Sequence, residues 1–572
     1  MSSLPSATII VVSLEVQSSF QAVPLGAASI VSALKADVAI SSVSTIILSD
    51  FSLESPLLQG LSPQEQGNLI AQSLVSTFNL QPASHLIAGF SLYVWNRPVL
   101  EYAAKELALL LPSVILFAGG PEVTSGSVFY SDEKSNANTL PPIYYLSGEG
   151  ESSTCTLIHL LLENKKIPSS LLAPNRSPSE NCAALVSPWL EGTLENCEGV
   201  LHHKGALWEL ARGCPYSCTY CCESKGEKKV RSFPLERLEK ELEYFIKIGI
   251  ERVFVLDPTY NASKERALRL LDLIFRKAPE IHFNFEVRAE LLDAQLVAAF
   301  SKIPCSLQIG LQSSNPEALK AVNRPCDFKS FTKKIGLLNN AGIIFGLDLM
   351  YGLPKDSFST FRNSIDFAVS QYPNNLEVFR LAVLPGTLLA EQAEGFGMKY
   401  AKTPPYLVES TPQFSHQDLE RAASLARACD LFYTQGRCVT WFNAALVPLK
   451  LKASQFFQDF ATFLLTVPKI VNSQEIPHTE LEKLQLSFLK AKYTEKQKAF
   501  LWPVLRDIIC LHGAWTRALA EGDETLLELS YHPEDLFSTD SMDLVYFTEN
   551  ACMEQCSVRV YSGPEGPDLE LL

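Results

Sequence analysis

Three closely spaced cysteines constrain this chain more than any other feature. Cys214, Cys218 and Cys221 follow the spacing C-x3-C-x2-C, directly behind an apolar segment, residues 207–210, that is expected to be a strand. Three thiolates on one loop can bind three irons of a [4Fe–4S] cluster and leave the fourth iron open to a substrate or cofactor. The alternatives are a zinc site completed by Cys222 or by an upstream histidine, and surface cysteines with no shared role.

The cysteine segment opens a regular alternation of short apolar stretches and helical patterns. Helices are expected, for example, over residues 235–248 and 328–340. Strands are expected over residues 207–210, 252–256, 282–287, 306–311, 344–350 and 377–384. Six βα units predict a partial or full parallel (β/α)6 barrel, and the active sites of such barrels lie at the C-terminal ends of the strands. The cysteines lie at such an end, which favours iron–sulfur over zinc.

A separate alternation of the same kind precedes the cysteines. Strands are expected over residues 7–14, 43–48, 85–91, 113–117 and 143–146, and helices over residues 25–34, 63–78, 97–111 and 152–162. Ser62, Pro63 and Glu65 supply the N-cap, first and third positions of a capping box. Buried strands with crossover helices predict a doubly wound, flavodoxin-like parallel sheet, whose ligands bind beyond the C-terminal ends of its strands.

The order of these patterns predicts an α/β protein with three folded domains. Residues 1–165 are expected to form the N-terminal sheet domain, and residues 166–200, rich in Pro, Ser and Asn, to form a linker. Residues 201–395 contain the barrel pattern. In residues 396–572 the alternation stops, and a mainly helical domain with no assigned role is expected.

Composition limits the partners and the location of the chain. The net charge is −15, and the first 150 residues carry four Lys and Arg against eleven Asp and Glu, so a nucleic-acid partner is not expected. No apolar stretch reaches the length of a bilayer span, no export signal is recognised, and most cysteines are scattered singly, which indicates the reducing cytoplasm. Cys552 and Cys556 have no third partner, so a frayed helical tail is favoured there over a second cluster.

Tyr220 places an aromatic residue directly before the third cysteine, which gives C-x3-C-x-aromatic-C. With this motif, residues 205–390 resemble the radical S-adenosylmethionine (SAM) enzymes. The resemblance implies that Cys214, Cys218 and Cys221 bind a [4Fe–4S] cluster, that its open iron binds SAM, and that its reduction cleaves SAM to a 5′-deoxyadenosyl radical. The segments at the strand ends imply SAM contacts from Tyr220, Asp257, Glu286, Arg288, Gln312 and Ser313.

Glycine-rich segments follow the N-terminal strands, at residues 24–26, 89–96, 119–123 and 148–150. With them, the first domain resembles the cobalamin-binding domain that precedes the barrel in a large group of radical SAM enzymes. The implied cobalamin contacts are Leu25, Gly26, Ser91, Tyr93, Trp95, Asn96, Gly119, Gly120, Pro121, Glu122, Val123, Gly148 and Glu149. A nucleotide site, a flavin site and a domain that binds nothing are the alternatives.

The lower axial ligand of the cobalt is an open point in this resemblance. The Asp-x-His-x-x-Gly motif that supplies a histidine ligand in other cobalamin proteins is missing, and His85 lies at the start of a strand, away from its C-terminal end. Tyr93, Trp95 and Asn96 are therefore expected to pack against the lower face of cobalamin. No histidine is expected below the cobalt.

Together the two resemblances imply a cobalamin-dependent radical SAM enzyme, first of all a methyltransferase acting at an unactivated carbon. The alternatives are a cobalamin-dependent radical rearrangement or cyclisation, and a non-catalytic iron–sulfur protein that senses cobalamin or redox state. The expected partners are a small-molecule, lipid or peptide substrate and an external electron donor of the flavodoxin or ferredoxin type. Residues 396–572 resemble the unassigned helical extension carried by one branch of this group.

Overall fold

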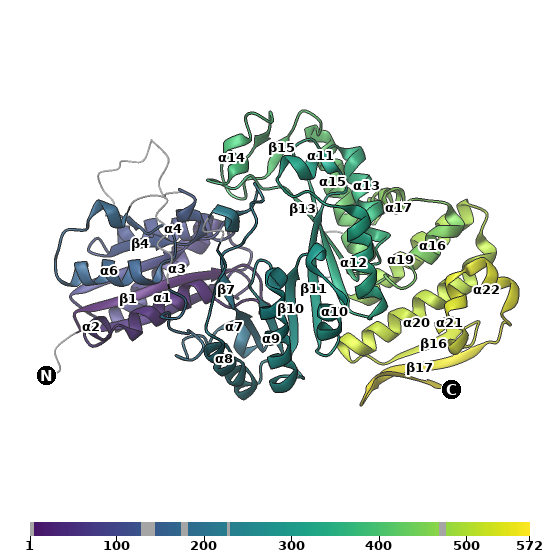
Figure 1. The fold of residues 1–572 in the computed structure, drawn as a ribbon, viewed down its shortest axis with the longest axis horizontal. Helices are drawn as coiled ribbons and strands as arrows, with labels where there is room; N and C mark the ends of the chain where they lie inside the picture. The colour runs from purple at the N-terminus through teal and green to yellow at the C-terminus, as the bar shows by residue number, and fades with distance from the viewer. Residues whose placement is uncertain (1–4, 127–142, 173–180, 226–228, 468–475) are drawn as a thin grey trace. The chain divides into compact units, whose positions relative to one another are not determined.

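The computed structural model describes residues 5–126, 143–172, 181–225, 229–467 and 476–572 (Figure 1). By compactness the chain divides into two units. The first consists of residues 1–307, 322–324 and 382–408, and the second of residues 308–321, 325–381 and 409–572. Among the described residues, no helix combines the length and the apolar character needed to cross a bilayer.

Five parallel strands form the first sheet, in the order β2-β1-β3-β4-β5. They are β1 (Ala7–Glu15), β2 (Ser44–Ser52), β3 (His85–Ser91), β4 (Ile115–Gly119) and β5 (Ile143–Tyr145). This is the flavodoxin-like strand order, in which ligands bind where the direction of winding reverses. The structure therefore confirms the expected doubly wound sheet.

Helices cover both faces of this sheet because successive side chains of a strand point to opposite faces. The helices are α1 (Leu25–Ala36), α2 (Val38–Ser41), α3 (Pro63–Leu80), α4 (Arg97–Leu110), α5 (Pro121–Thr124) and α6 (Glu151–Leu162). Ile10 and Val12 of β1 pack with α3 and α4, whereas Ile9 and Val11 pack with α1 and α6. The predicted capping box at Ser62 is present at the start of α3.

A second sheet has six strands in the order β13-β12-β11-β10-β9-β6. Its strands are β6 (Gly205–Trp208), β9 (Arg252–Val255), β10 (His282–Val287), β11 (Cys305–Gln312), β12 (Ile344–Tyr351) and β13 (Asn375–Arg380). Its helices are α8 (Leu235–Ile248), α9 (Lys264–Lys277), α10 (Ala294–Phe300), α11 (Pro316–Ala321), α12 (Phe328–Asn340) and α13 (Phe358–Val369). The pairs β6–β9, β9–β10 and β12–β13 are parallel. The expected barrel-type α/β fold is confirmed.

The segment predicted as a linker, residues 166–200, is anchored by buried side chains at several of the positions that the structure describes. Trp189 and Leu194 are buried, and α7 (Glu198–Leu201) ends the segment. The indole N–H of Trp189 donates to the carbonyl of Leu207 at 3.1 Å, and the hydroxyl of Ser187 donates to Glu241 at 2.5 Å. The composition indicated the lack of long strands and helices, but these hydrogen bonds hold the segment in place. Residues 173–180 of the predicted linker lie outside the described residues.

The C-terminal region contains more sheet than the sequence predicted. After the short strands β14 (Lys399–Tyr400) and β15 (Val408–Ser410), its helices are α15 (His416–Cys429), α16 (Phe442–Leu449), α17 (Ala453–Leu464), α19 (His478–Glu495), α20 (Trp502–Glu521), α21 (Pro533–Phe537) and α22 (Leu544–Asn550). β16 (Thr525–Leu529), β17 (Cys556–Gly563) and β18 (Gly566–Leu571) form an antiparallel sheet against α20.

The prediction of a frayed helical tail around Cys556 is wrong, because this residue opens strand β17. Val558 and Val560 of β17 are fully buried, so their burial favours the strand. The compact first unit also runs past the domain boundary predicted at residue 395, since it includes the chain as far as residue 408.

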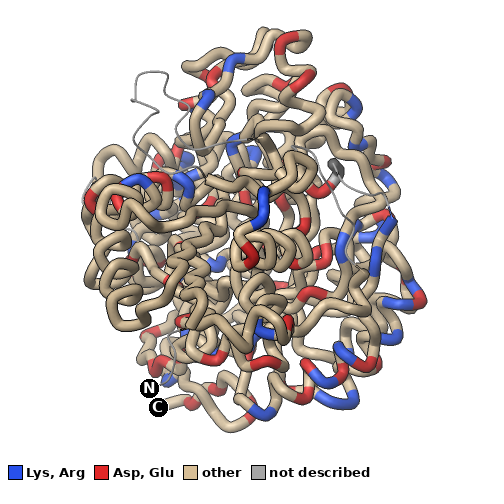
Figure 2. The backbone as a smooth tube through the Cα atoms, turned by 90° about the vertical axis from the view of Figure 1, so that its left-hand side faces the viewer, with Lys and Arg blue, Asp and Glu red and all other residues tan. Residues whose placement is uncertain are grey.

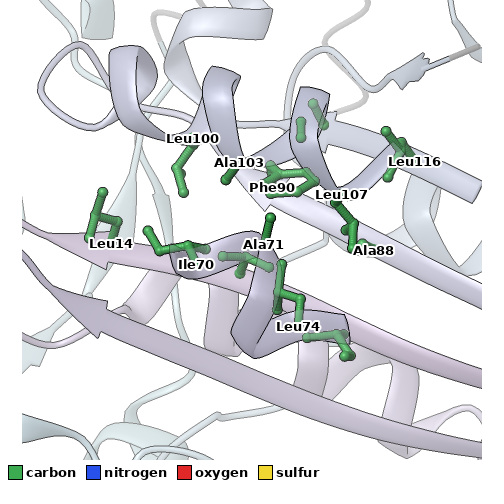
Figure 3. Close-up of a cluster of buried hydrophobic side chains, with 14 of the residues drawn as sticks. Leu14, Ile70, Ala71, Leu74, Ala88, Phe90, Leu100, Ala103, Leu107 and Leu116 are labelled. Carbon is green, nitrogen blue, oxygen red and sulfur yellow. The ribbon is translucent and has the colours of Figure 1, made fainter. Parts of the chain in front are cut away.

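The core between α3, α4 and the first sheet gives a matched test of stability. Leu74 and Leu80 lie on the same helix, but Leu74 is fully buried in this core (Figure 3), whereas Leu80 is 78% exposed. Leu74→Ala should lower the stability of the N-terminal domain by about 2–5 kcal/mol, because it removes buried methyl groups and leaves a cavity. Leu80→Ala should change it by less than about 0.5 kcal/mol. Thermal unfolding of the two full-length variants checks this, and equal transition temperatures would contradict the burial of Leu74.

Candidate functional site

The three cysteines lie between two short strands of the first unit. β7 (Ala211–Arg212) leads into the cysteine segment, and β8 (Arg231–Ser232) pairs antiparallel with it on the return. Gly213, directly after β7, has φ of +88°, a left-handed backbone that favours glycine. In the middle of the segment, the N–H of Thr219 donates to the carbonyl of Val322 at 3.1 Å. The carbonyl of Thr219 accepts from the N–H of Leu389 at 2.8 Å. The pairing of β7 with β8, which we call the neck of the segment, thus holds its two ends together, and the hydrogen bonds of Thr219 hold its middle.

The thiols themselves are shielded and lie beside a cation. Cys218 is buried, Cys214 and Cys221 are partly buried, and a guanidinium N–H of Arg324 donates to the Sγ of Cys218 at 3.7 Å. Burial raises the pKa of the Cys221 thiol to about 12. In the described part of the chain, no three His, Cys, Asp or Glu side chains are already gathered as a metal site. Three thiols on one anchored segment fit an iron–sulfur cluster by their chemistry, and the ligand assignment stays a prediction.

Asp257 lies just beyond β9, and other groups of the chain already bind its carboxylate. The carboxylate accepts the N–H groups of Leu210 at 3.2 Å and Ala211 at 2.9 Å, and it forms an ion pair with Arg266 at 2.8 Å. Burial raises the pKa of Asp257, against the opposing effect of Arg266. These contacts fix the turn from β6 into β7, so Asp257 anchors the start of the cysteine segment. Its predicted contact with SAM stays a prediction.

The other predicted SAM residues of the first unit differ in exposure. Glu286 at the end of β10 is exposed, whereas Arg288 is buried and lies over the ring of Tyr216 at 3.7 Å. Arg288 also donates to Glu290 at 2.5 Å. Because Tyr216 belongs to the cysteine segment, Arg288 is in direct contact with that segment. Tyr220 is partly exposed in the same segment, and burial raises its pKa.

Gln312 and Ser313 belong to the second unit, at the end of β11. Gln312 has φ of +68°, and its buried Oε1 has no hydrogen-bond partner. The hydroxyl of Ser313 is fully buried, 3.3 Å from that of Ser364. A non-glycine residue in the left-handed region with an unpartnered buried oxygen is a form of strain that collects at ligand sites. The local geometry of Gln312 is therefore consistent with the predicted contact.

A cavity of about 1000 Å³ lies within the first unit. Loops at the C-terminal ends of the first sheet contribute predicted cobalamin contacts to its lining: Leu25, Gly26, Ser91, Tyr93, Trp95, Gly119, Gly120, Pro121, Gly148 and Glu149. The same cavity is lined by Arg212, Gly213 and Cys222. The rings of Tyr93 and Trp95 stack with centroids 4.5 Å apart, and the described lining contains no histidine.

Asn96, Glu122 and Val123 were predicted to contact cobalamin, but the structure does not place them in this lining. The side chain of Asn96 is fully buried and bonds three backbone groups of its own loop and the neighbouring strand. Glu122 forms an ion pair with Arg97 at 2.9 Å and accepts the hydroxyl of Tyr406 at 2.8 Å. Val123 belongs to the core beneath α3 and α4. All three serve the fold around the cavity.

The lining also contains charged residues to which sequence reasoning gave no role. They are Glu15, Glu151, Glu209, Arg212 and Glu223. Burial raises the pKa of Glu15, Glu209 and Glu223. Arg324 beside Cys218 was missed as well. Position alone could have indicated Arg212, which directly precedes the cysteine segment, and Glu151, which directly follows the Gly-Glu-Gly loop after β5.

Comparison with known proteins agrees with this geometry. Residues 208–368 match the family model of the radical SAM superfamily. The chain is 25% identical over 352 residues to the cobalamin-dependent radical SAM methyltransferase TokK of Streptomyces tokunonensis, covering 55% of this chain and 49% of TokK. Residues 208–368 are thus similar to the radical SAM superfamily, and the chain is similar to a cobalamin-dependent member of it. A second relative, at 25% identity over 358 residues, is the 2-(S-pantetheinyl)-carbapenam-3-carboxylate methyltransferase of Streptantibioticus cattleyicolor, with 55% of this chain and 49% of that protein covered.

Solved structures of radical SAM enzymes share the fold. The cobalamin-dependent SAM radical enzyme OxsB, with aqua-cobalamin bound, has a TM-score of 0.55 at 13% identity, covering 96% of this chain and 85% of OxsB. The radical SAM methyltransferase TsrM of Kitasatospora setae, with cobalamin and a [4Fe–4S] cluster bound, has a TM-score of 0.52 at 14% identity, covering 71% of this chain and 82% of TsrM. The chain spans about half the length of the curated relatives it matches.

Adjacent cysteines give a sharp test of the predicted cluster ligands. Cys221→Ala should remove the cluster, because a methyl group cannot replace a thiolate ligand. Cys222→Ala should retain it. Iron and acid-labile sulfide content and visible absorption after anaerobic reconstitution measure both outcomes. Loss of the cluster in Cys222→Ala, or its full retention in Cys221→Ala, would contradict the assignment.

Proposed function

We propose that this radical SAM protein is a cobalamin-dependent methyltransferase that acts at an unactivated carbon. The observation that carries the proposal is the composition of the cavity wall. The strand-end loops of the first sheet and the two residues that lead into the cysteine segment, Arg212 and Gly213, line one cavity. A ligand held by the sheet therefore lies beside the segment that carries the predicted cluster ligands.

The cavity suits a wide ligand that approaches the backbone closely. Its volume of about 1000 Å³ is at the upper end of the range for small-molecule sites. Gly120 has φ of +102°, and a Cβ at Gly26 would lie 2.6 Å from the hydroxyl oxygen of Tyr93. Glycine at both positions keeps the lining open, which supports a corrin ring as the ligand.

Charge in the lining favours a corrinoid over a nucleotide or a flavin nucleotide. The acidic residues of the lining are Glu15, Glu149, Glu151, Glu209 and Glu223, and its basic residues are Arg212 and Arg231. Both arginines are already ion-paired with carboxylates. The two or more negative charges of a nucleotide or flavin nucleotide would meet like charge here, whereas cobalamin carries a single phosphodiester and its corrin ring bears amide side chains that can donate hydrogen bonds to carboxylates.

Each part of the site then has a defined task. Cys214, Cys218 and Cys221 would hold the cluster, and Tyr93 and Trp95 would cover the lower face of cobalamin. When bound, the cluster with SAM supplies a radical that removes a hydrogen atom from the substrate, and cobalamin supplies the methyl group. The protein binds and orients these groups and excludes water from them.

The partners follow from the same proposal. A small molecule, a lipid or a peptide is the proposed substrate, and an external donor of the flavodoxin or ferredoxin type would reduce the cluster in the cytoplasm. Lys and Arg lie interspersed with Asp and Glu in the view of Figure 2, and the net charge is −15. This charge distribution disfavours a nucleic-acid substrate, which calls for a basic surface.

Product analysis distinguishes the proposal from its alternatives. After anaerobic reconstitution with cobalamin, SAM and a reductant, the methyltransferase should release both 5′-deoxyadenosine and S-adenosylhomocysteine when its substrate is supplied. A rearrangement or cyclisation enzyme should release 5′-deoxyadenosine without S-adenosylhomocysteine, and a sensor should release neither. Mass spectrometry of the two products makes the measurement, with Cys218→Ala as the cluster-free control. Failure of the full chain to bind any corrinoid would overturn the proposal.

The lower face of cobalamin can be tested by electron paramagnetic resonance of the Co(II) form. A nitrogen ligand splits each cobalt line into three, because 14N has a nuclear spin of one. We expect no splitting from a nitrogen of the protein, since no histidine is found in the described lining of the cavity. His85→Ala should leave the spectrum unchanged, because His85 opens β3 and bonds the carbonyl of Ser6. A triplet that disappears in His85→Ala would contradict this prediction.

A further inference from the structure

At the neck of the cysteine segment, where β7 and β8 pair, two arginines lie directly opposite each other. β7 and β8 form an antiparallel pair in which Arg212 lies opposite Arg231. All three predicted cluster ligands lie between these two residues in the sequence. Like charges directly across a strand pair destabilise it. The neck therefore needs a negative charge to stay closed.

Glu149 supplies that charge to both arginines. Its Oε2 accepts from Nη1 of Arg212 at 3.3 Å and from Nη1 of Arg231 at 3.2 Å, and its Oε1 accepts from Nη2 of Arg231. The three side chains are largely shielded, with exposed fractions of 23% for Glu149, 14% for Arg212 and 17% for Arg231. Shielded ion pairs of this kind are costly to break, because the remaining charges lose their partner.

Two further carboxylates fix Arg212 in position. Glu209 binds it with two parallel hydrogen bonds, to Nε at 2.9 Å and to Nη2 at 3.1 Å, and Glu151 accepts from Nη2 at 2.7 Å. Such a two-point contact with a guanidinium fixes orientation as well as charge. Because Glu209 and Glu151 hold Arg212 in place, a movement of Glu149 shifts mainly Arg231, and with it the pairing of β8 with β7.

Glu149 also belongs to the wall of the cavity. It lies between Gly148 and Gly150, in the loop that follows β5, and all three residues line the cavity. Gly148 has φ of +86°, and the N–H of Gly148 donates to the hydroxyl of Thr124 at 3.0 Å. The carboxylate that closes the neck of the cysteine segment is therefore carried by a loop against which the proposed corrinoid would rest.

We propose that Glu149 is a positioning residue that couples the two cofactor sites of this chain. Corrinoid in the cavity orders the loop of Glu149, which holds Arg212 and Arg231 together and closes the neck of the segment that carries the cluster. By linkage the effect is reciprocal, so a bound cluster tightens corrinoid binding by the same factor. This inference rests on the proposed function, because it takes the cavity to bind a corrinoid.

The test measures this coupling directly in the full-length protein. The dissociation constant of hydroxocobalamin is determined by titration, with and without the reconstituted cluster. Wild type should bind hydroxocobalamin about fivefold or more tightly when the cluster is present, within the usual range of coupling between sites. Glu149→Gln should bring this ratio close to one. Glu163→Gln, at the other end of α6, is the matched control and should keep the wild-type ratio, because Glu163 is exposed and forms its ion pair with Lys165 at the surface.

A second variant covers the case in which Glu149→Gln does not fold. Glu149→Asp keeps the charge but is one methylene shorter, so it cannot reach both arginines with the same geometry. It should fold and give a reduced ratio. A wild-type ratio of one, or an undiminished ratio in Glu149→Asp or Glu149→Gln, overturns the inference.

A measurement without cofactors separates this inference from the proposed function. Amide hydrogen exchange of peptides covering residues 213–223 should be faster in Glu149→Gln or Glu149→Asp than in Glu163→Gln, because the neck opens more often. If no variant binds a corrinoid but this difference is found, the proposed function fails while the neck closure stands. If exchange is the same in all of them, the role of Glu149 in the neck is wrong, whatever the chain binds.

Discussion

The buried carboxylate of Asp257 is the contact on which the geometry of the site depends. It receives the backbone N–H groups of Leu210 and Ala211 at the end of β6, and Arg266 balances its charge. Unpaired backbone donors at this depth would carry the full cost of desolvation, about 1–3 kcal/mol each. Because Asp257 lies just beyond the end of β9, the sheet determines where the chain leaves β6 and enters the cysteine segment. The segment that carries the predicted thiol ligands is in this way attached to a strand of the sheet.

Much of the fold could be read from the sequence, because its strongest patterns are local. Residues 235–248 were predicted as a helix and form α8 with the same bounds, since an amphipathic pattern ends there at Gly249, which has φ of +75°. β3 also has the predicted bounds. The sheet of the C-terminal region was missed, because its short strands are half-buried and depend on packing against α20, which lies far from β17 in the sequence.

The site could be predicted as a set of loops, but not residue by residue. Strand-end glycines indicated the wall of the cavity, and most of the predicted contacts lie in it. Asn96, Glu122 and Val123 do not, because Asn96 bonds backbone groups, Glu122 pairs with Arg97, and Val123 packs into the core. The pairing of Glu149 with Arg212 and Arg231 was out of reach for another reason: the partners are 63 and 82 positions apart, and no local pattern reports such contacts.

The contact of Glu122 and Arg97 with Tyr406 has a consequence for how this chain can be divided. Tyr406 reaches the first unit by way of residues 382–408, a stretch that returns to it after the strands of the second sheet. The first unit is therefore discontinuous in sequence, and a cut at the end of the barrel pattern would remove the phenol partner of the buried Glu122 and the partly buried Arg97. Gene fusion and the exchange of modules between relatives are constrained accordingly. A junction after residue 408 leaves the first unit whole, whereas one a few residues earlier divides it.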